Sequence, residues 1–371
     1  MPASLETVEA KVSAGARLDR EDGLAVLASG DLVAVGRLAD AARRRRHGLR
    51  AFYVVNTHVN YTNVCINCCR FCAFHRDPAD PGAYLLGPEE VLARARPDLE
   101  AGATEVHIVG GLHPAVDLDY VLAVVARLHE AFPQVSVQAF TAVEVAYAAA
   151  RAGLEAGQVL GRLRDAGLTG LPGGGAEIFD PEVRREICPR KISGRQWLDV
   201  HRAAHRLGIP TNATMLYGHV ERAEHRVDHL LALRTLQDET GGFLAFVPLA
   251  FHPHATGYAD RPGPTACDDL KTIACARLLL DNVPHVKAFW IMLGPDVAQV
   301  ALRFGADDMD GTVMREEITH AAGARTPERL SAAEIEHLIR AAGCEPVERD
   351  TLYRRIVRRP PGAPAWTRRE A

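Results

Sequence analysis

Apolar and polar residues follow two different periods along this chain. From about residue 51 onward, short β-branched or apolar runs are followed by stretches with apolar residues at helical spacing, such as LDYVLAVVARLHEAF. Regular alternation of strand and helix implies parallel strands with helical crossovers. The candidate strands are AFYVVNTHVN, EVHIVGG, VSVQAFTAV, LTGLPGG, PTNATMLYG, FLAFVPLAF, VKAFWIML and ADDMDG. They predict an α/β fold, a closed TIM-type (β/α)8 barrel, with an open doubly wound sheet as the alternative.

Polar residues follow many of these predicted strands, and their placement favours the barrel. The carboxyl ends of the strands carry the active site in such barrels. The residues concerned are His58, Asn60, His113, Thr141, Glu144, Glu177, His219, His252 and His254. We therefore expect the functional site at that end of the strands.

The same patterns divide the chain into an N-terminal helical extension, the barrel and a small C-terminal α/β extension with a loose tail. The predicted bounds are residues 1–48, 49–320 (halves 49–220 and 221–320) and 321–371. Asp19 and Asp31 are predicted helix N-caps, and the arginine run 43–46 fits a last helical turn. Ser331 and Glu334 have the spacing of a capping box.

Composition and charge exclude several classes of protein. The chain has 371 residues, of which 47% are hydrophobic and 24% charged, and its net charge is −4. This charge predicts no nucleic-acid partner. No apolar stretch approaches the roughly 18 residues of a membrane span, and the first residues lack a signal-peptide pattern. We expect a cytoplasmic protein, in which clustered cysteines indicate metal or redox chemistry rather than disulfides.

Four of the eight cysteines lie within one short segment, Cys65, Cys68, Cys69 and Cys72. Adjacent thiolates are poor ligands of one tetrahedral ion, so three usable ligands remain, spaced C-x3-C-x2-C or C-x2-C-x3-C. Thiolate-only ligation favours an iron–sulfur cluster, and three thiolates leave one iron of a cubane without a protein ligand. A structural zinc ion or incidental cysteines are the alternatives.

The spacing C-x3-C-x2-C, with Phe71 before the last cysteine, resembles the signature of the radical S-adenosylmethionine (SAM) superfamily. The resemblance implies that Cys65, Cys69 and Cys72 hold a 4Fe–4S cluster with one open iron, and that Cys68 is not a ligand. It also implies that SAM binds as co-substrate within a radical SAM barrel.

Longer segments resemble one group of this superfamily, the aminodeoxyfutalosine synthases, over roughly residues 15–355. These segments are HVNYTNVC, HIVGGLHP, QAFTAVE, GGGAEIFDPEVR, HRVDHLLALRTLQDETGGF and GADDMDGT. The resemblance implies a transferase of the futalosine route to menaquinone. Such an enzyme adds the 5′-deoxyadenosyl radical of SAM to 3-[(1-carboxyvinyl)oxy]benzoate, giving 6-amino-6-deoxyfutalosine, methionine and bicarbonate. It also implies a flavodoxin- or ferredoxin-type electron donor.

The same resemblance suggests further site residues. Gly110 and Gly111 match the glycine motif for the methionine amino group, and Glu144 and Glu177 are candidate SAM contacts. Glu144 and His113 are the candidate catalytic residues. His252 and His254 are candidates for the substrate carboxylates. Alternative functions are dehypoxanthine futalosine cyclase, FO synthase or, in a different class, an iron–sulfur electron carrier.

Overall fold

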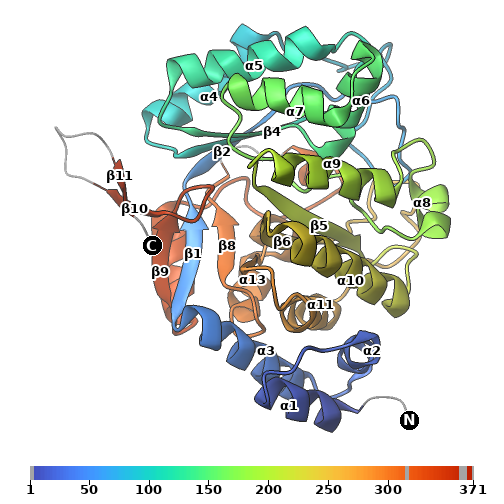
Figure 1. Ribbon diagram of the computed structural model, residues 1–371, viewed down its shortest axis with the longest axis vertical. Helices are drawn as coiled ribbons and strands as arrows, with labels where there is room; N and C mark the ends of the chain where they lie inside the picture. The colour runs from blue at the N-terminus through green and yellow to red at the C-terminus, as the bar shows by residue number, and fades with distance from the viewer. Residues whose placement is uncertain (1–3, 314–316, 359–365, 370–371) are drawn as a thin grey trace.

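A computed structural model of the protein describes residues 4–313, 317–358 and 366–369. Helices α4–α7 and α9–α11 lie on the outside of strands β2–β6, whereas β9, β10 and β11 lie at the left edge of the molecule (Figure 1). The helices are α1 (Leu5–Ser13), α2 (Arg20–Ala28), α3 (Leu32–His47), α4 (Pro88–Glu100), α5 (Leu118–Ala131), α6 (Ala142–Ala152), α7 (Ala156–Asp165), α8 (Pro181–Ile187), α9 (Gly194–Arg206), α10 (Ala223–Thr240), α11 (Ala266–Leu279), α12 (Trp290–Leu293), α13 (Pro295–Ala301), α14 (Ile318–Ala321) and α15 (Ala332–Ala341).

The strands are β1 (Arg50–Val54), β2 (Asn56–Asn60), β3 (Glu105–Val109), β4 (Ser136–Ala139), β5 (Thr211–Tyr217), β6 (Phe243–Ala250), β7 (His285–Val286), β8 (Asp308–Gly311), β9 (Glu345–Arg349), β10 (Arg355–Arg358) and β11 (Trp366–Arg369). They form three sheets, with orders β11-β10-β9-β1-β8, β2-β3-β4 and β5-β6-β7. Pairing between the strands of the predicted barrel is parallel. The α/β prediction is therefore confirmed.

The prediction of a closed barrel is wrong, because the described strands do not form one continuous sheet. The first predicted strand divides at Val55: β1 pairs with β8 and β9, whereas β2 pairs with β3. The fourth predicted strand, LTGLPGG, forms only isolated bridges, from Gly170 to Gln138 and from Leu171 to Thr211. Pro172 has no N–H for a ladder, and the glycines on either side favour irregular backbone.

Three further predictions need correction or refinement. VKAFWIML is mostly not a strand, because β7 ends at Val286 and α12 follows it. Part of the predicted loose tail is ordered, since β11 pairs antiparallel with β10. Residues 359–365 and 370–371 of that tail lie outside the described residues. The division into three segments stays a prediction.

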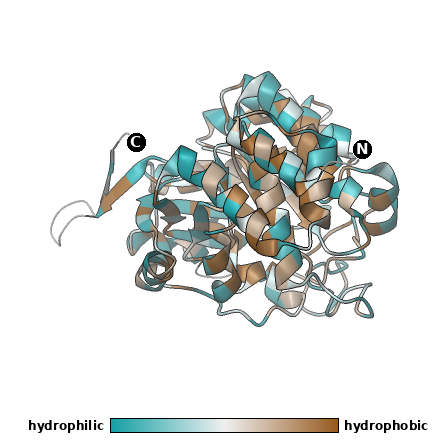
Figure 2. Cartoon of the chain, turned by 90° about the horizontal axis from the view of Figure 1, so that it is seen from below, coloured by the Kyte–Doolittle hydropathy of each residue, from teal (hydrophilic) through white to brown (hydrophobic). Residues whose placement is uncertain are grey.

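The helices follow the predicted amphipathic pattern. The buried residues of α5 are Leu118, Val121, Val124, Val125 and Leu128, spaced three or four apart on one face. Figure 2 shows hydrophilic and hydrophobic residues interspersed along the outer helices. No helix among the described residues is long and apolar enough to cross a membrane. The cytoplasmic location stays a prediction.

The N-terminal helices begin as the sequence predicts. Asp19 and Asp31 accept hydrogen bonds from backbone N–H groups in the first turns of α2 and α3. The arginine run occupies the last turn of α3, where Arg45 and Arg46 donate to the carbonyl oxygens of Val12 and Val283. These two hydrogen bonds tie the end of α3 to α1 and to the segment before β7, so the run stabilises the fold. Helices α2 and α3 also pack against α11.

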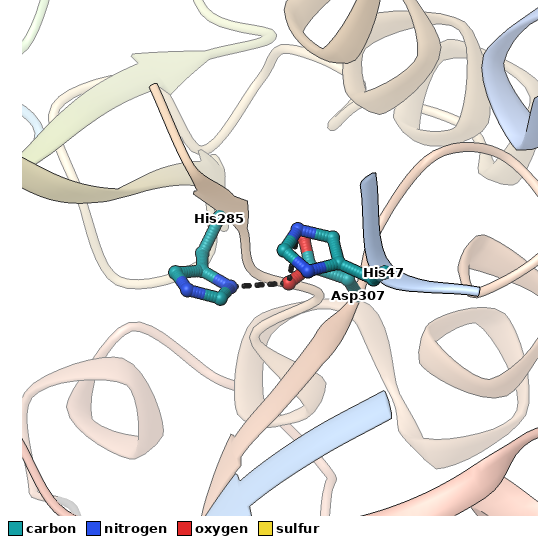
Figure 3. A group of neighbouring side chains, drawn as sticks. All are labelled: His47, His285 and Asp307. Carbon is teal, nitrogen blue, oxygen red and sulfur yellow. Dashed lines mark hydrogen bonds and ion pairs between the residues drawn. The ribbon is translucent and has the colours of Figure 1, made fainter. Parts of the chain in front are cut away.

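A buried cluster of His47, His285 and Asp307 joins α3 to the starts of β7 and β8 (Figure 3). Asp307 Oδ2 lies 2.5 Å from His285 Nδ1 and 3.4 Å from His47 Nε2. The three ligand atoms lie within 4.8 Å of one another, as in a metal site. However, Arg277 forms an ion pair with Asp307, and His47 Nε2 lies 2.9 Å from the Pro284 carbonyl oxygen. We therefore interpret the cluster as structural, and we call these three residues the clasp because they join α3 to β7 and β8.

Two buried histidines predict that acid destabilises the protein. Burial, the first cause in each case, lowers the pKa of His47 to about 4 and that of His229 to about 3. An unfolded chain with histidine pKa near 6.5 binds more protons below that pH, so folding stability falls as the pH drops from about 6.5 toward 4. The free energy of unfolding falls by up to about 1.4 kcal/mol per pH unit for each histidine.

The measurement is urea-induced unfolding of wild type and His229→Gln at pH 7 and pH 5. The glutamine can still donate to the Thr214 carbonyl oxygen, which lies 2.9 Å from His229 Nε2, but does not titrate. We expect a smaller pH dependence in His229→Gln than in wild type. The exposed His337→Gln serves as the control and should keep the wild-type dependence. Equal slopes in all three proteins would refute the explanation.

Candidate functional site

One cavity of about 350 Å³ lies between the inner faces of the strands and is lined by residues from all three sheets. Alternate residues of β2, β3, β5 and β6 line it, as the two-residue period of a strand requires. For example, His58 and Asn60 on β2 line the cavity, as do His107 and Val109 on β3. The segment of clustered cysteines that directly follows β2 lines it as well.

Three of the four clustered cysteines line the cavity, namely Cys65, Cys69 and Cys72. Cys68 is not among the lining residues. Its sulfur lies 3.5 Å from the Cys65 carbonyl oxygen and 3.7 Å from Arg190 Nη1. All four are free thiols. Cys68 also has a positive φ of 44°, which costs a non-glycine residue energy and is consistent with a functionally constrained loop.

Gly110 and Gly111, after β3, hold the backbone close to the cysteine segment. A Cβ on Gly111 would lie 2.1 Å from the Val64 carbonyl oxygen, and one on Gly110 would lie 2.7 Å from the Tyr61 ring. Only glycine fits at such distances. Both residues lie at the cavity, as predicted, but the structure gives a packing reason for them that the sequence did not reveal.

Glu144 is a buried residue in the first turn of α6, and it lines the cavity. Its carboxylate accepts hydrogen bonds from Tyr61 Oη at 2.8 Å, from the Gly110 N–H at 3.1 Å and from the Thr141 N–H at 2.7 Å. Burial raises the pKa of Glu144 to about 7, although these donors oppose the shift. Glu144 therefore ties the end of β3 to α6 and is poised to hold or release a proton near neutral pH.

Glu177 also lines the cavity, where it forms a buried ion pair. Lys191 Nζ lies 2.6 Å from Glu177 Oε1, and both side chains are largely buried. Arg184, on α8, does not pair with Glu177 but donates to carbonyl oxygens such as those of Ala176 and Ile178. Lys191 also lies over the Phe71 ring at 5.1 Å. Sequence reasoning missed Lys191, for which no motif provided a signal.

The structure separates the three candidate histidines. His252 lines the cavity, and its Nε2 lies 3.0 Å from the Met292 carbonyl oxygen. His113 is not a lining residue, and its Nδ1 accepts the Ala115 N–H. His254 is exposed and does not line the cavity either.

Polar residues on or beside the strands also line the cavity, and we call this group the polar end. They are His58, His107, Gln138, Asn212, Lys287 and Asp310. Only His58 among them was singled out in the sequence analysis, as a polar residue after a strand. A polar residue at every second position of a central strand was the available signal.

Comparison with known proteins assigns the chain to a family. Residues 59–233 match the radical SAM superfamily, and residues 240–360 match the CofH/MqnC C-terminal region. The first match contains the cysteine segment, and the second contains Lys287 and Asp310.

Several proteins of assigned function are similar along most of their length. Aminodeoxyfutalosine synthase of Thermus thermophilus is 47% identical over 350 residues, which is 93% of this chain and 94% of that protein. The synthase of Streptomyces coelicolor is 45% identical, covering 93% and 92%. A 5-amino-6-(D-ribitylamino)uracil--L-tyrosine 4-hydroxyphenyl transferase of Methanopyrus kandleri is 45% identical, covering 86% and 88%.

Solved structures with similar folds are more distant in sequence. Methylornithine synthase (PylB) matches with a TM-score of 0.74 and 19% identity, over 91% of this chain and 97% of that chain. The FeFe-hydrogenase maturase HydG from Carboxydothermus hydrogenoformans matches with a TM-score of 0.71 and 17% identity, over 94% and 80%. These two matches bear on the fold alone. The chain therefore belongs to the radical SAM superfamily and is a transferase similar to the aminodeoxyfutalosine synthases.

Proposed function

We propose that this protein is an aminodeoxyfutalosine synthase of the futalosine route to menaquinone. It joins the 5′-deoxyadenosyl group of SAM to 3-[(1-carboxyvinyl)oxy]benzoate, with release of methionine and bicarbonate. The observation that carries this proposal is the identity of 47% and 45% to two such synthases, along more than nine-tenths of each chain.

The superfamily implies a 4Fe–4S cluster and SAM, and the residues at the cavity fit both groups. We assign Cys65, Cys69 and Cys72 as the cluster ligands, because these three free thiols share one cavity wall that Cys68 does not join. A soft, thiolate-only donor set suits an iron–sulfur cluster. When bound and reduced, the cluster supplies the electron that breaks the S–C5′ bond of SAM. A flavodoxin- or ferredoxin-type protein is the proposed donor of that electron.

The chain's own residues would bind and orient SAM beside the cysteine segment. Gly110 and Gly111 bring backbone close to that segment, and Glu144 holds the N–H of Gly110. The Glu177–Lys191 pair presents both a carboxylate and an ammonium group, which match the hydroxyl, amino and carboxylate groups of SAM. His252 is the remaining predicted substrate contact at the cavity. We assign no role in the reaction to His113 and His254, because neither lines the cavity.

One observation favours a second candidate function. The hydroxyphenyl transferase of Methanopyrus kandleri is 45% identical, only slightly below the two synthases. Such an enzyme would act on L-tyrosine and 5-amino-6-(D-ribitylamino)uracil, as its name says, rather than on the enol-ether benzoate. The two candidate functions therefore differ in the substrates used.

The product formed by the anaerobically reconstituted protein tests the proposal. We expect SAM, dithionite and 3-[(1-carboxyvinyl)oxy]benzoate to give a product in which the adenosyl carbon skeleton is joined to the benzoate, detected by mass spectrometry. Replacing the benzoate with L-tyrosine and the ribitylaminouracil serves as the competing arm. Turnover in that arm alone would overturn the synthase proposal and favour the hydroxyphenyl transferase.

A further inference from the structure

The polar end of the cavity contains a lysine whose partners do not use all of its donors. Lys287 follows β7, and its side chain is 6% exposed. Its Nζ lies 3.0 Å from Asp310 Oδ1, and this is its one hydrogen bond among the described residues. An ammonium group has three N–H donors. Buried donors without acceptors cost free energy, so two donors of Lys287 remain for a ligand in the cavity.

The hydrogen-bond partner of Lys287, Asp310, has an unusual backbone conformation. Asp310 has a positive φ of 66°, and its N–H donates to Asp308 Oδ1 at 2.5 Å. A non-glycine residue in this region of backbone space is strained and often marks a functional site. Asp310 is thereby fixed opposite Lys287, and it keeps the ammonium oriented within the cavity.

Two amide side chains that line the cavity have hydrogen-bonding groups to spare. Asn212, on β5, is only 7% exposed, lines the cavity and has no side-chain hydrogen bond within the described part of the chain. Gln138 Oε1 lies 3.0 Å from His107 Nδ1, and the described residues offer no acceptor to its amide N–H groups. Asn212 and Gln138 can therefore hydrogen-bond a polar ligand in the cavity.

The other charges near this end are compensated within the protein. Glu105 accepts a hydrogen bond from Thr351 Oγ1 at 2.5 Å and lies 4.0 Å from Arg349. Arg349 also pairs with Asp308 at 2.7 Å. Burial and the neighbouring histidine lower the pKa of His58 to about 3, so this ring adds no charge. Among the described residues, Lys191 and Lys287 are the only lysines or arginines lining the cavity.

These two cations have different partners. Lys191 pairs with Glu177 and contacts Phe71 in the cysteine segment, where SAM is proposed to bind. Lys287 follows β7, is bridged to β8 at Asp308 and pairs with Asp310. The second substrate of the proposed reaction carries two carboxylates and needs cationic or amide donors.

We propose that Lys287, held by Asp310 and assisted by Asn212 and Gln138, forms a carboxylate-binding subsite for the second substrate. This inference rests on the proposed function and extends it to one substrate-specifying residue. Charge-assisted hydrogen bonds from Lys287 anchor one carboxylate. The rest of the substrate then extends toward the clustered cysteines.

The test is the affinity of the cluster-loaded, oxidised protein for 3-[(1-carboxyvinyl)oxy]benzoate, measured by anaerobic equilibrium dialysis in the presence of SAM. We expect Lys287→Met to weaken binding about 30-fold, in line with a lost charge-assisted hydrogen bond. Each monomethyl ester of the substrate is measured as well. Esterifying the anchored carboxylate should weaken binding to wild type by a similar factor and have little further effect in Lys287→Met.

Controls separate this subsite from general damage and from a wrong function. Lys271→Met, on α11 and outside the cavity, should keep wild-type affinity. If Lys287→Met fails to fold because Asp310 keeps only the more distant Arg349, 3.9 Å away, Lys287→Met/Asp310→Asn removes both charges and carries the test. Unchanged affinity, or effects that are equal in wild type and variant for both monomethyl esters, would overturn the subsite.

A wrong proposed function would give a different set of binding results. In that case wild type does not bind the enol-ether benzoate but binds L-tyrosine. The same comparison is then made with L-tyrosine and its methyl ester. Non-additive effects of Lys287→Met and esterification would support a carboxylate subsite for tyrosine, and additive effects would overturn it.

Discussion

Replacing Cys65, Cys69 or Cys72 with alanine is expected to abolish iron–sulfur binding and formation of any adenosyl-containing product. Each of these thiols lines the cavity, and a cubane that loses one of only three protein ligands has too few to remain bound. Iron and sulfide content, the visible absorption of the reconstituted protein and the product assay measure the effect.

Cys68→Ser is the matched control for these variants. The sulfur of Cys68 lies near Arg190 and the Cys65 carbonyl oxygen, and this residue does not line the cavity. We expect this variant to keep its cluster and most of its activity. An inactive Cys68→Ser together with an active Cys69→Ser would mean that the other spacing, C-x2-C-x3-C, binds the cluster.

The second large effect concerns folding. Asp307→Asn is expected to lower the free energy of unfolding by about 3–5 kcal/mol, because it leaves the buried Arg277 without its carboxylate partner. Although burial opposes ionisation, His285 and Arg277 hold the pKa of Asp307 well below its usual range. The stabilisation is therefore present at neutral pH and is lost only as the pH falls below the ordinary pKa of an aspartate.

Urea-induced unfolding followed by circular dichroism at pH 7 measures this loss. Asp165→Asn is the matched control, since its carboxylate is 69% exposed and, within the described ranges, pairs with the neighbouring Arg164 alone. Exposed pairs contribute about 0–1 kcal/mol. If Asp307→Asn and Asp165→Asn unfold at the same urea concentration, the clasp does not stabilise the fold as described.

Local features of the chain were largely predictable. The caps of α2, α3 and α15 depend on residues two or three positions apart, and all three are present in the structure. Strand and helix alternation likewise indicated the α/β class. The prediction of a closed barrel was wrong, because strand pairing at Val55 and around Pro172 depends on neighbours that are distant in the chain.

The candidate site likewise combines features that the sequence predicted with features that it did not. The cysteine spacing lies within eight residues, so the sequence alone indicated a soft-metal centre and its superfamily, which the family match confirms. Within the cavity, Glu144 and Glu177 lie where expected, whereas His113 and His254 do not line it. A histidine after a strand is a weak signal, since the loop that follows can turn its side chain either way.

Sequence by itself determined the short-range properties of this protein: its helix starts, its strand period and the spacing of three thiols. Only the tertiary structure decided which charges meet, as in the pairs Glu177–Lys191 and Lys287–Asp310 and in the clasp of His47, His285 and Asp307. Caps and thiol spacing depend on the geometry of a few consecutive residues. Ion pairs between separate elements depend instead on how the whole chain packs, since their strength is governed by burial and by distances that no local pattern encodes.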